Sequence, residues 1–444
     1  ACIVLVIPFA RLPAIAGMPL PGYLTILLLF VGFSLLAPSL LQRLGKSLAP
    51  YLRRKVSVPA YLAGRYVRDS GARTSVSIGA LITAVALFTS LVIMIHSFRQ
   101  TVELWVQQTI SGELFVTTKM GGVNRFRYPI EREVVTGLKE LAEETDMVPS
   151  RRYQLRYGGF PYEFEVMAMD VFLRRGSFVW LEGNLETLEP KIVSGEGVLV
   201  SEVFSNRTGL VIGDTFKADI DGSAVQLPIL GIVRDYRTNG GVVFYSLSGF
   251  EDRFHMPQWS GVRFYLPAGK SGDSKAVNRL RGDLAERFGD RLDMISGQSL
   301  RETVLRFFDE TFAVTIVLLL IALVVAALGI ATTLTVLVLE RSRQLNTLFA
   351  VGASFRQIRS MIFWEAGFLV VAGELGGLAC GLILSYVLIF VINRQSFGWT
   401  FLYGVDWGAL AISVPLIVLT ALMAAIPAVR MVFREPPATL LRER

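Results

Sequence analysis

The distribution of apolar residues along the chain predicts a helical membrane protein. A bilayer core needs about 20 mostly apolar residues in a helix. The sequence has four runs of that length and a longer fifth run, at residues 22–41, 76–98, 312–339, 406–429 and 361–392. A buried helix of a soluble protein is the alternative for any one of them. A shorter apolar run at residues 2–10 is interpreted as the tail of an earlier span, with Ala1 as a cut end of a longer chain.

The charges between these runs predict the orientation of the chain. Lys and Arg dominate residues 42–75, the loop after residue 339 and the tail at residues 430–444. Cytoplasmic loops carry such an excess of basic residues, so we expect these three segments, and with them the C-terminus, in the cytoplasm. The remaining segments then lie outside, and the alternation is consistent through all five spans.

Residues 99–311 form the longest polar stretch, and it contains no run long enough to span a membrane. Their patterns predict strands and helices, with strands at 191–200, 211–220, 225–233 and 241–245, and helices at 133–144 and 275–288. The predicted fold is therefore an α-helical transmembrane bundle with a large α+β extracytoplasmic domain inserted between two spans. The acidic residues of this domain are dispersed along the sequence, and it carries no hydrolase or metalloprotease motif. We expect it to bind a partner or transmit force, not to catalyse a reaction.

Composition and charge exclude other classes of function. Only 18% of the residues are charged, against about 25% in a typical soluble domain. Residues 100–310 hold 25 Lys and Arg against 30 Asp and Glu, and the rest of the chain holds 19 against 7. The basic excess thus flanks the membrane runs, which argues against a nucleic-acid partner. Two Cys and two His are too few for a disulfide framework or a His-rich metal site.

The sequence lacks a phosphate-binding loop for ATP. Gly269, Lys270 and Ser271 resemble the end of such a loop, but Phe264 stands where its first Gly is required. We therefore expect that this chain is not an enzyme and binds no cofactor. Any ATP and Mg²⁺ are expected on a separate partner chain.

A short amphipathic segment follows the span at 312–339. Residues 340–350 predict a helix with Leu345, Leu348 and Phe349 on one side. Gly352 suits the C-terminal cap of this helix, and Ser354 suits the N-cap of the next one. Such a helix either docks into a groove on a partner or rests on lipid head groups, and the residues alone favour neither.

The span at 361–392 contains two features that are unusual inside a membrane. Gly373, Gly377 and Gly381 recur at every fourth position, which favours close helix packing over mere slack in a long helix. Glu365 and Glu374 are carboxyl groups in the same run. An intramembrane carboxyl is a functional candidate. The alternatives for Glu374 are a protonated group that bonds to a neighbouring helix and a position near the outer leaflet in a broken span.

Several motifs resemble the FtsX-like permease family of ABC transporters, which includes MacB-type permeases. The family pattern E-x-R-x-E-I-x-x-L-R-A-x-G-A-S, followed by Q-I and a later acid, is matched at Glu340, Arg343, Leu348, Ala350, Gly352, Ala353, Ser354, Gln357, Ile358 and Glu365. Residues 62–87, 197–216 and the C-terminal tail, with Pro427, Ala428, Arg430, Pro436 and Leu441, resemble the family in the same order. Gln344, Leu345 and Phe349 depart from its pattern, so this helix is less charged than is usual in the family.

The resemblance implies a coupling helix that contacts a cytoplasmic ABC ATPase dimer. Its expected contact residues are Glu340, Arg341, Arg343, Gln344, Leu345, Leu348, Phe349, Gly352, Ala353 and Ser354. It also implies a MacB-like periplasmic core domain, a second permease unit (the missing N-terminal half or another subunit), contact with membrane lipid, and a place in the bacterial inner membrane. ATP-driven export or extraction of a hydrophobic, lipid-linked or peptide cargo is the implied function. The alternatives are mechanical regulation of an extracytoplasmic protein such as an enzyme, and peptide sensing or resistance without transport.

These expectations divide the chain into eight segments. They are a first span with the tail of an earlier one (1–42), a basic cytoplasmic linker (43–75), a span (76–98), the external domain (99–311), a span (312–339), the coupling segment (340–360), two further spans (361–429) and the tail (430–444).

Overall fold

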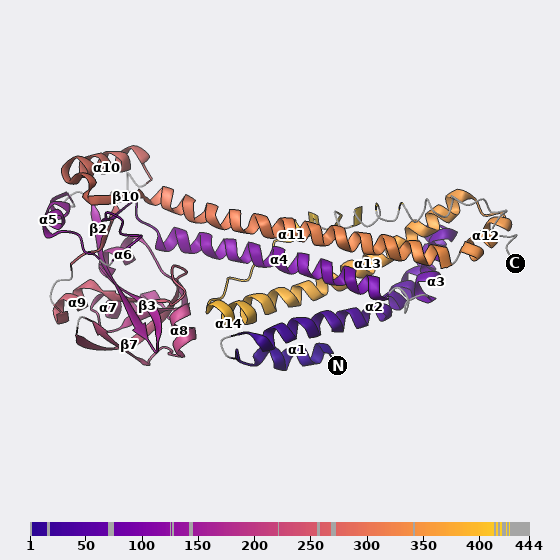
Figure 1. Cartoon of the computed structure of the whole chain (residues 1–444), viewed down its shortest axis with the longest axis horizontal. Coiled ribbons are helices and arrows are strands. Elements are labelled where there is room, and N and C mark those ends of the chain that lie inside the picture. The colour runs from indigo at the N-terminus through magenta and orange to yellow at the C-terminus, as the bar shows by residue number, and fades with distance from the viewer. Residues whose placement is uncertain are drawn as a thin grey trace. The chain divides into compact units, whose positions relative to one another are not determined.

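The computed structural model of the chain forms two compact units (Figure 1). It describes residues 2–15, 18–69, 75–124, 126, 128–141, 145–220, 222–254, 258–267, 272–340, 342–412, 414–415, 418–419, 423 and 426. The first unit, here called the helical unit, comprises Ala1–Phe98, Thr311–Ser396 and Phe401–Arg444. The second, the sheet unit, comprises Arg99–Glu310 together with the short segment Phe397–Thr400.

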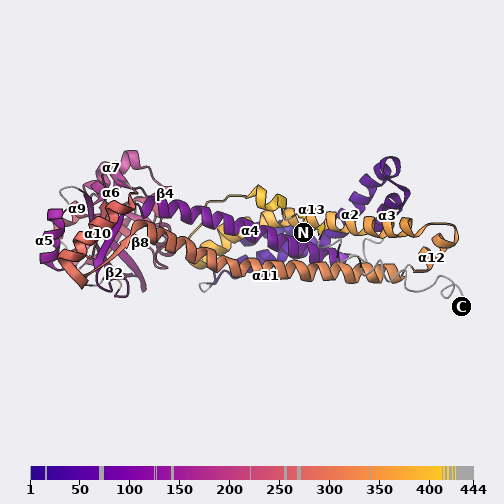
Figure 2. The ribbon, with the colours of Figure 1, turned by 90° about the horizontal axis from the view of Figure 1, so that it is seen from above.

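The described part of the helical unit is built from helices, several of them long and apolar. They are α1 (Cys2–Arg11), α2 (Leu20–Lys55), α3 (Val58–Asp69), α4 (Ser75–Thr109), α11 (Gly297–Glu340), α12 (Ser342–Ala350), α13 (Phe355–Val387) and α14 (Arg394–Phe397), with a π-helical turn at Leu388–Asn393 between the last two. The last residues of α4 and α14 and the first part of α11 belong to the sheet unit. Segment 43–75, predicted as a linker, is largely helical, because α2 continues to Lys55 and then folds back into α3 (Figure 2).

Three helical stretches of the described chain are long and apolar enough to cross a membrane. They are Leu20–Ser47, Ile78–Thr109 and Phe355–Phe397. The predicted spans at 22–41 and 361–392 fall inside the first and third stretches, and the predicted span at 76–98 begins two residues before the second. The predicted span at 312–339 lies in α11, where many side chains are outside the described residues, and the span at 406–429 is described only in part. The tail at 430–444 lies outside the described residues altogether.

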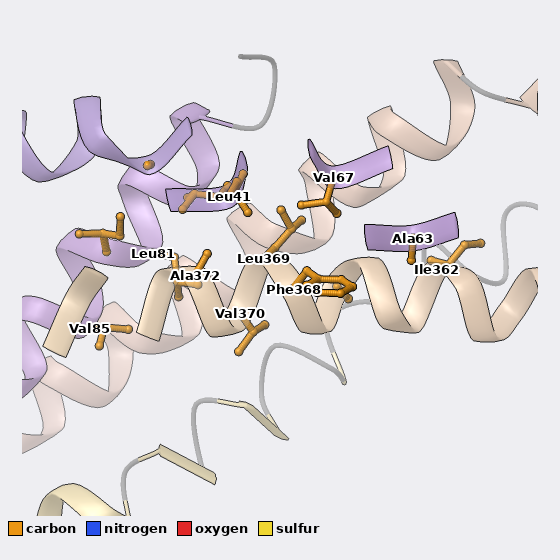
Figure 3. Packing of buried hydrophobic residues seen from close by; sticks show 14 of the residues in the cluster. Leu41, Ala63, Val67, Leu81, Val85, Ile362, Phe368, Leu369, Val370 and Ala372 are labelled. Carbon is orange, nitrogen blue, oxygen red and sulfur yellow. The ribbon is translucent and has the colours of Figure 1, made fainter. Parts of the chain in front are cut away.

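Helix α13 packs against the other helices through one apolar cluster. Figure 3 shows Phe368, Leu369 and Ala372 of α13 near Leu41 of α2 and Val67 of α3. All five side chains are buried. In lipid, close packing of this kind takes the place of the hydrophobic effect as the force that holds helices together.

The described residues of the sheet unit form a 10-stranded mixed sheet in the order β10-β1-β9-β2-β3-β8-β5-β7-β4, with β6 paired to β7. The strands are β1 (Leu114–Thr118), β2 (Asp146–Tyr157), β3 (Phe160–Met167), β4 (Val179–Glu182), β5 (Val198–Ser201), β6 (Thr215–Ile220), β7 (Ser223–Arg234), β8 (Val242–Ser246), β9 (Gly261–Tyr265) and β10 (Leu292–Ser296). The helices are α5 (Arg132–Leu141), α6 (Met169–Arg175), α7 (Leu185–Val193), α8 (Glu202–Thr208), α9 (Leu247–Phe254) and α10 (Ser274–Phe288). The predicted α+β class is therefore confirmed.

The sheet unit contains more strands than the sequence patterns predict. The predicted strand at 191–200 is wrong in its first part, because residues 191–193 end helix α7. Strands β2 and β3 were not predicted, because inward-facing Arg and Glu residues interrupt the apolar alternation that marks a half-buried strand. Helices α5 and α10 lie side by side (Figure 1) and bury Leu138 and Phe288 in one cluster, as their predicted apolar faces require.

Candidate functional site

The joint between α12 and α13 is fixed by two complementary caps. The backbone amides of Gly352 and Ala353 donate to the carbonyls of Phe349 and Leu348 at 3.0 and 2.9 Å, which forms a Schellman motif. Gly352 has φ +103°, a conformation that L side chains rarely adopt. Both predicted cap positions, Gly352 and Ser354, are confirmed.

The second cap begins helix α13. The Gln357 backbone amide donates to Ser354 Oγ at 3.3 Å, and the Ser354 amide donates to Gln357 Oε1 at 2.8 Å. This capping box satisfies two amides that a helix N-terminus otherwise leaves unpaired. The two caps together hold α12 and α13 at a defined turn.

We expect Gly352→Ala to destabilise this joint by about 1–2 kcal/mol, because alanine is strained at positive φ. The backbone amides of residues 352 and 353, which donate the Schellman hydrogen bonds, should exchange with solvent about tenfold faster or more. Hydrogen exchange followed by mass spectrometry on the full chain measures this. Gly367→Ala in α13 is the matched control, since nothing lies within 4 Å of the Cβ it adds. Unchanged exchange at the joint would contradict the described turn.

The apolar side of α12 packs on the chain itself. Leu345 is buried in the cluster that contains Ile358 of α13, and Phe349 packs against that cluster. The Phe349 ring also meets the Phe355 ring edge-on, with centroids 4.4 Å apart. Leu345 and Phe349, predicted to contact a partner, thus contribute to the internal packing of the bundle.

The surface left open at this joint includes apolar residues. Val351 is 83% exposed, and Phe355 is also exposed. Glu340, Gln344, Gly352 and Ser354 are exposed as well, whereas Leu348 and Ala353 are half-buried. Arg341 and the side chain of Arg343 lie outside the described residues.

The three spaced glycines of α13 face one side of α4. A Cβ added to Gly373 or Gly377 would collide with Leu81 or Val85. A Cβ added to Gly381 would lie 2.7 Å from Thr89 Cβ and 3.0 Å from the Ala86 carbonyl oxygen. Leu81, Val85 and Thr89 are themselves spaced by four residues, so the contact is a continuous seam in which the two backbones approach closely.

Both carboxyl groups of the α13 run are buried. Glu365 and Glu374 are 2% and 5% exposed. Neither carboxylate oxygen of Glu374 has a hydrogen-bond partner among the described residues. Glu374 remains a candidate for a functional intramembrane carboxyl on this ground.

The sheet unit contains a buried charge cluster that the sequence analysis missed. Glu165, on β3, is fully buried, and Arg237 Nη1 lies 2.7 Å from its Oε2 atom. Arg152 and Arg263 both lie 3.4 Å from its Oε1 atom. Burial disfavours the charged form of Glu165, but the charges of Arg237, Arg152 and Arg263 outweigh burial and hold its pKa well below the ordinary value.

Part of this cluster could have been predicted from the sequence. Gly158 and Gly159 both have positive φ and form the two-residue turn that joins β2 to β3. Gly-Gly between two strands is a strong hairpin signal. Counting back from this turn pairs Arg152 with Glu165, as observed. The acidic residues are dispersed along the sequence, as expected. In the folded unit, however, Glu163 and Glu165 gather in one cluster with arginines, so the expectation does not hold for the structure.

The end of α4 is anchored by arginines of the sheet unit. Arg263 Nη1 donates to the Thr109 carbonyl at 3.1 Å, and Arg301 Nη1 donates to the Ile110 carbonyl at 2.7 Å. The last carbonyls of a helix lack partners within the helix and carry partial negative charge, so cationic donors stabilise them.

A segment distant in sequence completes the sheet unit. Thr400 Oγ1 donates to Glu202 Oε1 at 2.6 Å, and Asn206 Nδ2 donates to the Gly398 carbonyl at 2.7 Å. The Tyr236 ring also meets the Trp399 ring, with centroids 5.0 Å apart. This segment begins with the last residue of α14, almost 200 residues after Glu202 and Asn206, so the contact was not predictable from local pattern.

Among the described residues, no three His, Cys, Asp or Glu side chains gather in a way that could hold a metal ion. The charge cluster instead pairs its acids with arginines. The arrangement is suited to rigid support of the sheet and of the α4 terminus.

Comparison with known proteins relates the second half of the chain to a permease family. Residues 316–437 match the family described as FtsX-like permease C-terminal. An uncharacterized ABC transporter permease of Mycobacterium tuberculosis is 29% identical over 377 residues, which cover 83% of this chain and 43% of that protein. An uncharacterized ABC transporter permease of Methanocaldococcus jannaschii is 27% identical over 124 residues, which cover 28% of this chain and 31% of that protein. The chain thus spans less than half the length of either relative.

Two solved structures are similar to part of the chain. The periplasmic region of MacB from Actinobacillus actinomycetemcomitans aligns with a TM-score of 0.31 and 12% identity, over 44% of this chain and 92% of that one. The extracellular domain of the noncanonic ABC-type transporter YknZ from Gram-positive bacteria aligns with a TM-score of 0.28 and 14% identity, over 42% of this chain and 99% of that one. These TM-scores are too low to support an argument from either structure. The fold of the sheet unit is therefore described from its own strand order.

Proposed function

From the match of residues 316–437 to the FtsX-like permease C-terminal family, which agrees with the resemblance seen in the sequence, we propose that the chain is the membrane-spanning subunit of an ABC transporter. In this proposal, a partner ATPase hydrolyses ATP and the chain converts that cycle into movement of its sheet unit. The cargo is a hydrophobic, lipid-linked or peptide molecule that is exported or extracted. The chain itself has no enzymatic activity and binds no cofactor.

The observation that carries the proposal is the capped joint at residues 350–354. A partner that pushes on α12 moves α13 with it, because the Schellman motif and the capping box fix the turn between them. Val351, at the tip of this joint, is largely exposed. An exposed apolar residue on a rigid corner is suited to insert into a pocket of a partner protein.

The connections between the two units support transmission of force. The chain passes from one unit to the other after residues 98, 310, 396 and 400. Helices α4 and α11 each continue without a break across these boundaries. Since Arg263 and Arg301 hold the end of α4, a shift of that helix is passed to β9 and to the start of α11.

These connections also favour a second candidate function, in which the chain transmits force to an extracytoplasmic protein such as an enzyme, or senses a peptide, without transport. Both candidate functions use the same coupling joint. In both, we propose that the chain lies in the bacterial inner membrane with its C-terminus in the cytoplasm. It works there with an ATPase dimer, a second permease unit and surrounding lipid.

The coupling joint is tested with Val351→Lys. A lysine near the end of α12 is compatible with the helix dipole, so the joint should stay folded while an apolar contact is lost. We expect binding of the partner ATPase to weaken by about tenfold or more, which corresponds to about 1.4 kcal/mol. Co-purification of the full chain with cytoplasmic ABC ATPases, and the stimulated ATPase rate, measure this.

Val211→Lys provides the matched control, because Val211 is an exposed valine of the sheet unit. This variant should bind the ATPase as the unaltered chain does. Equal binding of the ATPase by both variants would show that the joint is not part of the docking surface. Loss of stimulated ATP hydrolysis with binding retained would place Val351 in transmission and not in docking.

A further inference from the structure

Helices α2 and α3 form a hairpin whose turn is fixed by local sequence. The backbone amides of Val56 and Ser57 both donate to the Leu52 carbonyl at 3.1 Å, which ends α2. Ser57 Oγ then accepts the Ala60 amide at 3.3 Å, as an N-cap does, and Pro59 lies in the first turn of α3, where no amide is needed. The chain therefore reverses within two residues, and α3 runs back along α2 (Figure 2).

One face of α3 packs into the helical unit through small residues. Ala63 and Val67 are buried in the apolar cluster to which α13 contributes (Figure 3). On the α2 side, a Cβ added to Gly45 would lie 2.9 Å from the Gly64 carbonyl oxygen and 3.1 Å from Arg68 Cβ. The two helices therefore touch at Gly45 and Gly64, and this contact fixes the position of α3 along α2.

The contact between Gly45 and Gly64 brings three exposed cations to one level of the helical unit. Arg43 and Lys46 lie within two residues of Gly45 on α2, and Arg65 follows Gly64 on α3. All three side chains are exposed. Within the described part of the chain, none of the three forms an ion pair with an acid. Their charges are therefore available to a ligand.

These cations lie where α2 leaves the membrane in the proposed topology. The apolar stretch of α2 ends at Ser47, one residue after Lys46. Residues 42–75 hold eight Lys and Arg against one acid, so the hairpin carries net positive charge. Guanidinium and ammonium groups bind phosphate oxygens through charge-assisted hydrogen bonds. Basic clusters directly cytoplasmic of a span are typical sites for anionic lipids.

We propose that the α2–α3 hairpin binds an anionic phospholipid of the cytoplasmic leaflet. Arg43, Lys46 and Arg65 hold its phosphate. An acyl chain lies along Leu36, which is 47% exposed and two turns before Arg43 on the same face of α2. This inference rests on the proposed placement of the chain in a membrane, but it does not involve the ATPase. Failure of lipid binding would therefore leave the outcome at Val351 unaffected.

The test measures lipid binding to the full chain in detergent by native mass spectrometry, without any ATPase. Phosphatidylglycerol and phosphatidylcholine with the same acyl chains are titrated separately, and the dissociation constant of the first bound lipid is obtained for each. A cation near a lipid phosphate strengthens binding by about fivefold, so three should favour phosphatidylglycerol by about 100-fold. Equal affinity for the two lipids would overturn the proposal.

Two variants separate an assembled site from general attraction between basic residues and lipid. The triple substitution Arg43→Gln, Lys46→Gln and Arg65→Gln should abolish the preference and leave the affinity for phosphatidylcholine unchanged. Gly45→Leu keeps every cation but moves α3 away from α2, because the Gly64 carbonyl oxygen obstructs the new side chain. Since Arg65 then leaves the site, phosphatidylglycerol should bind about fivefold more weakly or more.

The matched control removes three exposed cations of the sheet unit, through Lys217→Gln, Arg279→Gln and Arg281→Gln. It makes the same change in net charge as the triple substitution, and it should bind both lipids as the unaltered chain does. In each variant, made in a Cys2→Ser background, the buried Cys380 should stay unreactive toward a maleimide, which shows that the helical unit remains folded.

Three further results would contradict a lipid site at the hairpin. The first is a triple variant that still prefers phosphatidylglycerol. The second is unchanged phosphatidylglycerol binding in Gly45→Leu, which would show that the cations act singly. The third is a triple variant that loses co-purification with the ATPase but binds both lipids normally, which would assign this surface to a partner protein.

Discussion

Replacing Glu165 by glutamine should destabilise the sheet unit by about 3–5 kcal/mol. Removing one partner of a buried ion cluster leaves the other charges uncompensated in a poorly hydrated site. Arg237, Arg152 and Arg263 all lie within 3.4 Å of the Glu165 carboxylate.

Hydrogen exchange on the full chain gives the measurement. We expect the amides of β2, β3 and β9 to exchange about 100-fold faster or more in Glu165→Gln. Glu189→Gln, at an exposed position of α7, is the control and should leave exchange unchanged. If β3 kept its protection, the cluster would not be a source of stability.

The same group predicts a pH dependence. The pKa of Glu165 is lower in the folded chain than its ordinary value of about 4.3. Its stabilising contribution is therefore fully present above about pH 5 and is lost as the pH falls through the depressed folded value. Glu165→Gln should lack this acid-sensitive part of the stability, while the two chains should share the same pH dependence near neutral pH.

Replacing Gly377 by leucine should separate α13 from α4 and destabilise the helical unit. Even the first side-chain carbon would collide with Val85, and the Ile82 carbonyl oxygen lies 3.2 Å from that carbon. Because one obstacle is backbone, the helices must move apart. Overpacking of this kind costs about 1–3 kcal/mol, or more where backbone must shift.

Cys380 reports on this seam directly. It is 0% exposed, lies on α13 beside Gly381 and belongs to the cluster that joins the helices. In a Cys2→Ser background, its reaction with a maleimide should be about tenfold faster or more in Gly377→Leu. Gly367→Leu is the control on the same helix, because nothing lies within 4 Å of an added Cβ there. Equal reaction rates in the two variants would contradict a tight seam.

The sequence predicts best what depends on neighbouring residues. The apolar runs at 22–41, 76–98 and 361–392 each lie within a long helix, because about 20 apolar residues leave few other stable structures. The caps at Gly352 and Ser354 are likewise local, since glycine at positive φ and a serine N-cap act within a few residues.

The charge cluster shows where local pattern ends. Arg152 and Glu165 meet because of a hairpin register, which a Gly-Gly turn encodes. Arg263 joins them from strand β9, and Arg237 joins them from the loop between β7 and β8, both much further along the chain. Their placement depends on strand order, which single-sequence periodicity does not contain.

The contact made by residues 397–400 has a consequence for how the protein is synthesised. Its partners, Glu202 and Asn206, emerge from the ribosome nearly 200 residues before Gly398 and Thr400. A nascent sheet unit therefore waits for helix α13 to be made before its last hydrogen bonds can form. If translation stalls after β10 but before residues 397–400 are made, the sheet unit lacks these contacts. It would then be exposed to quality-control proteases in an incomplete state.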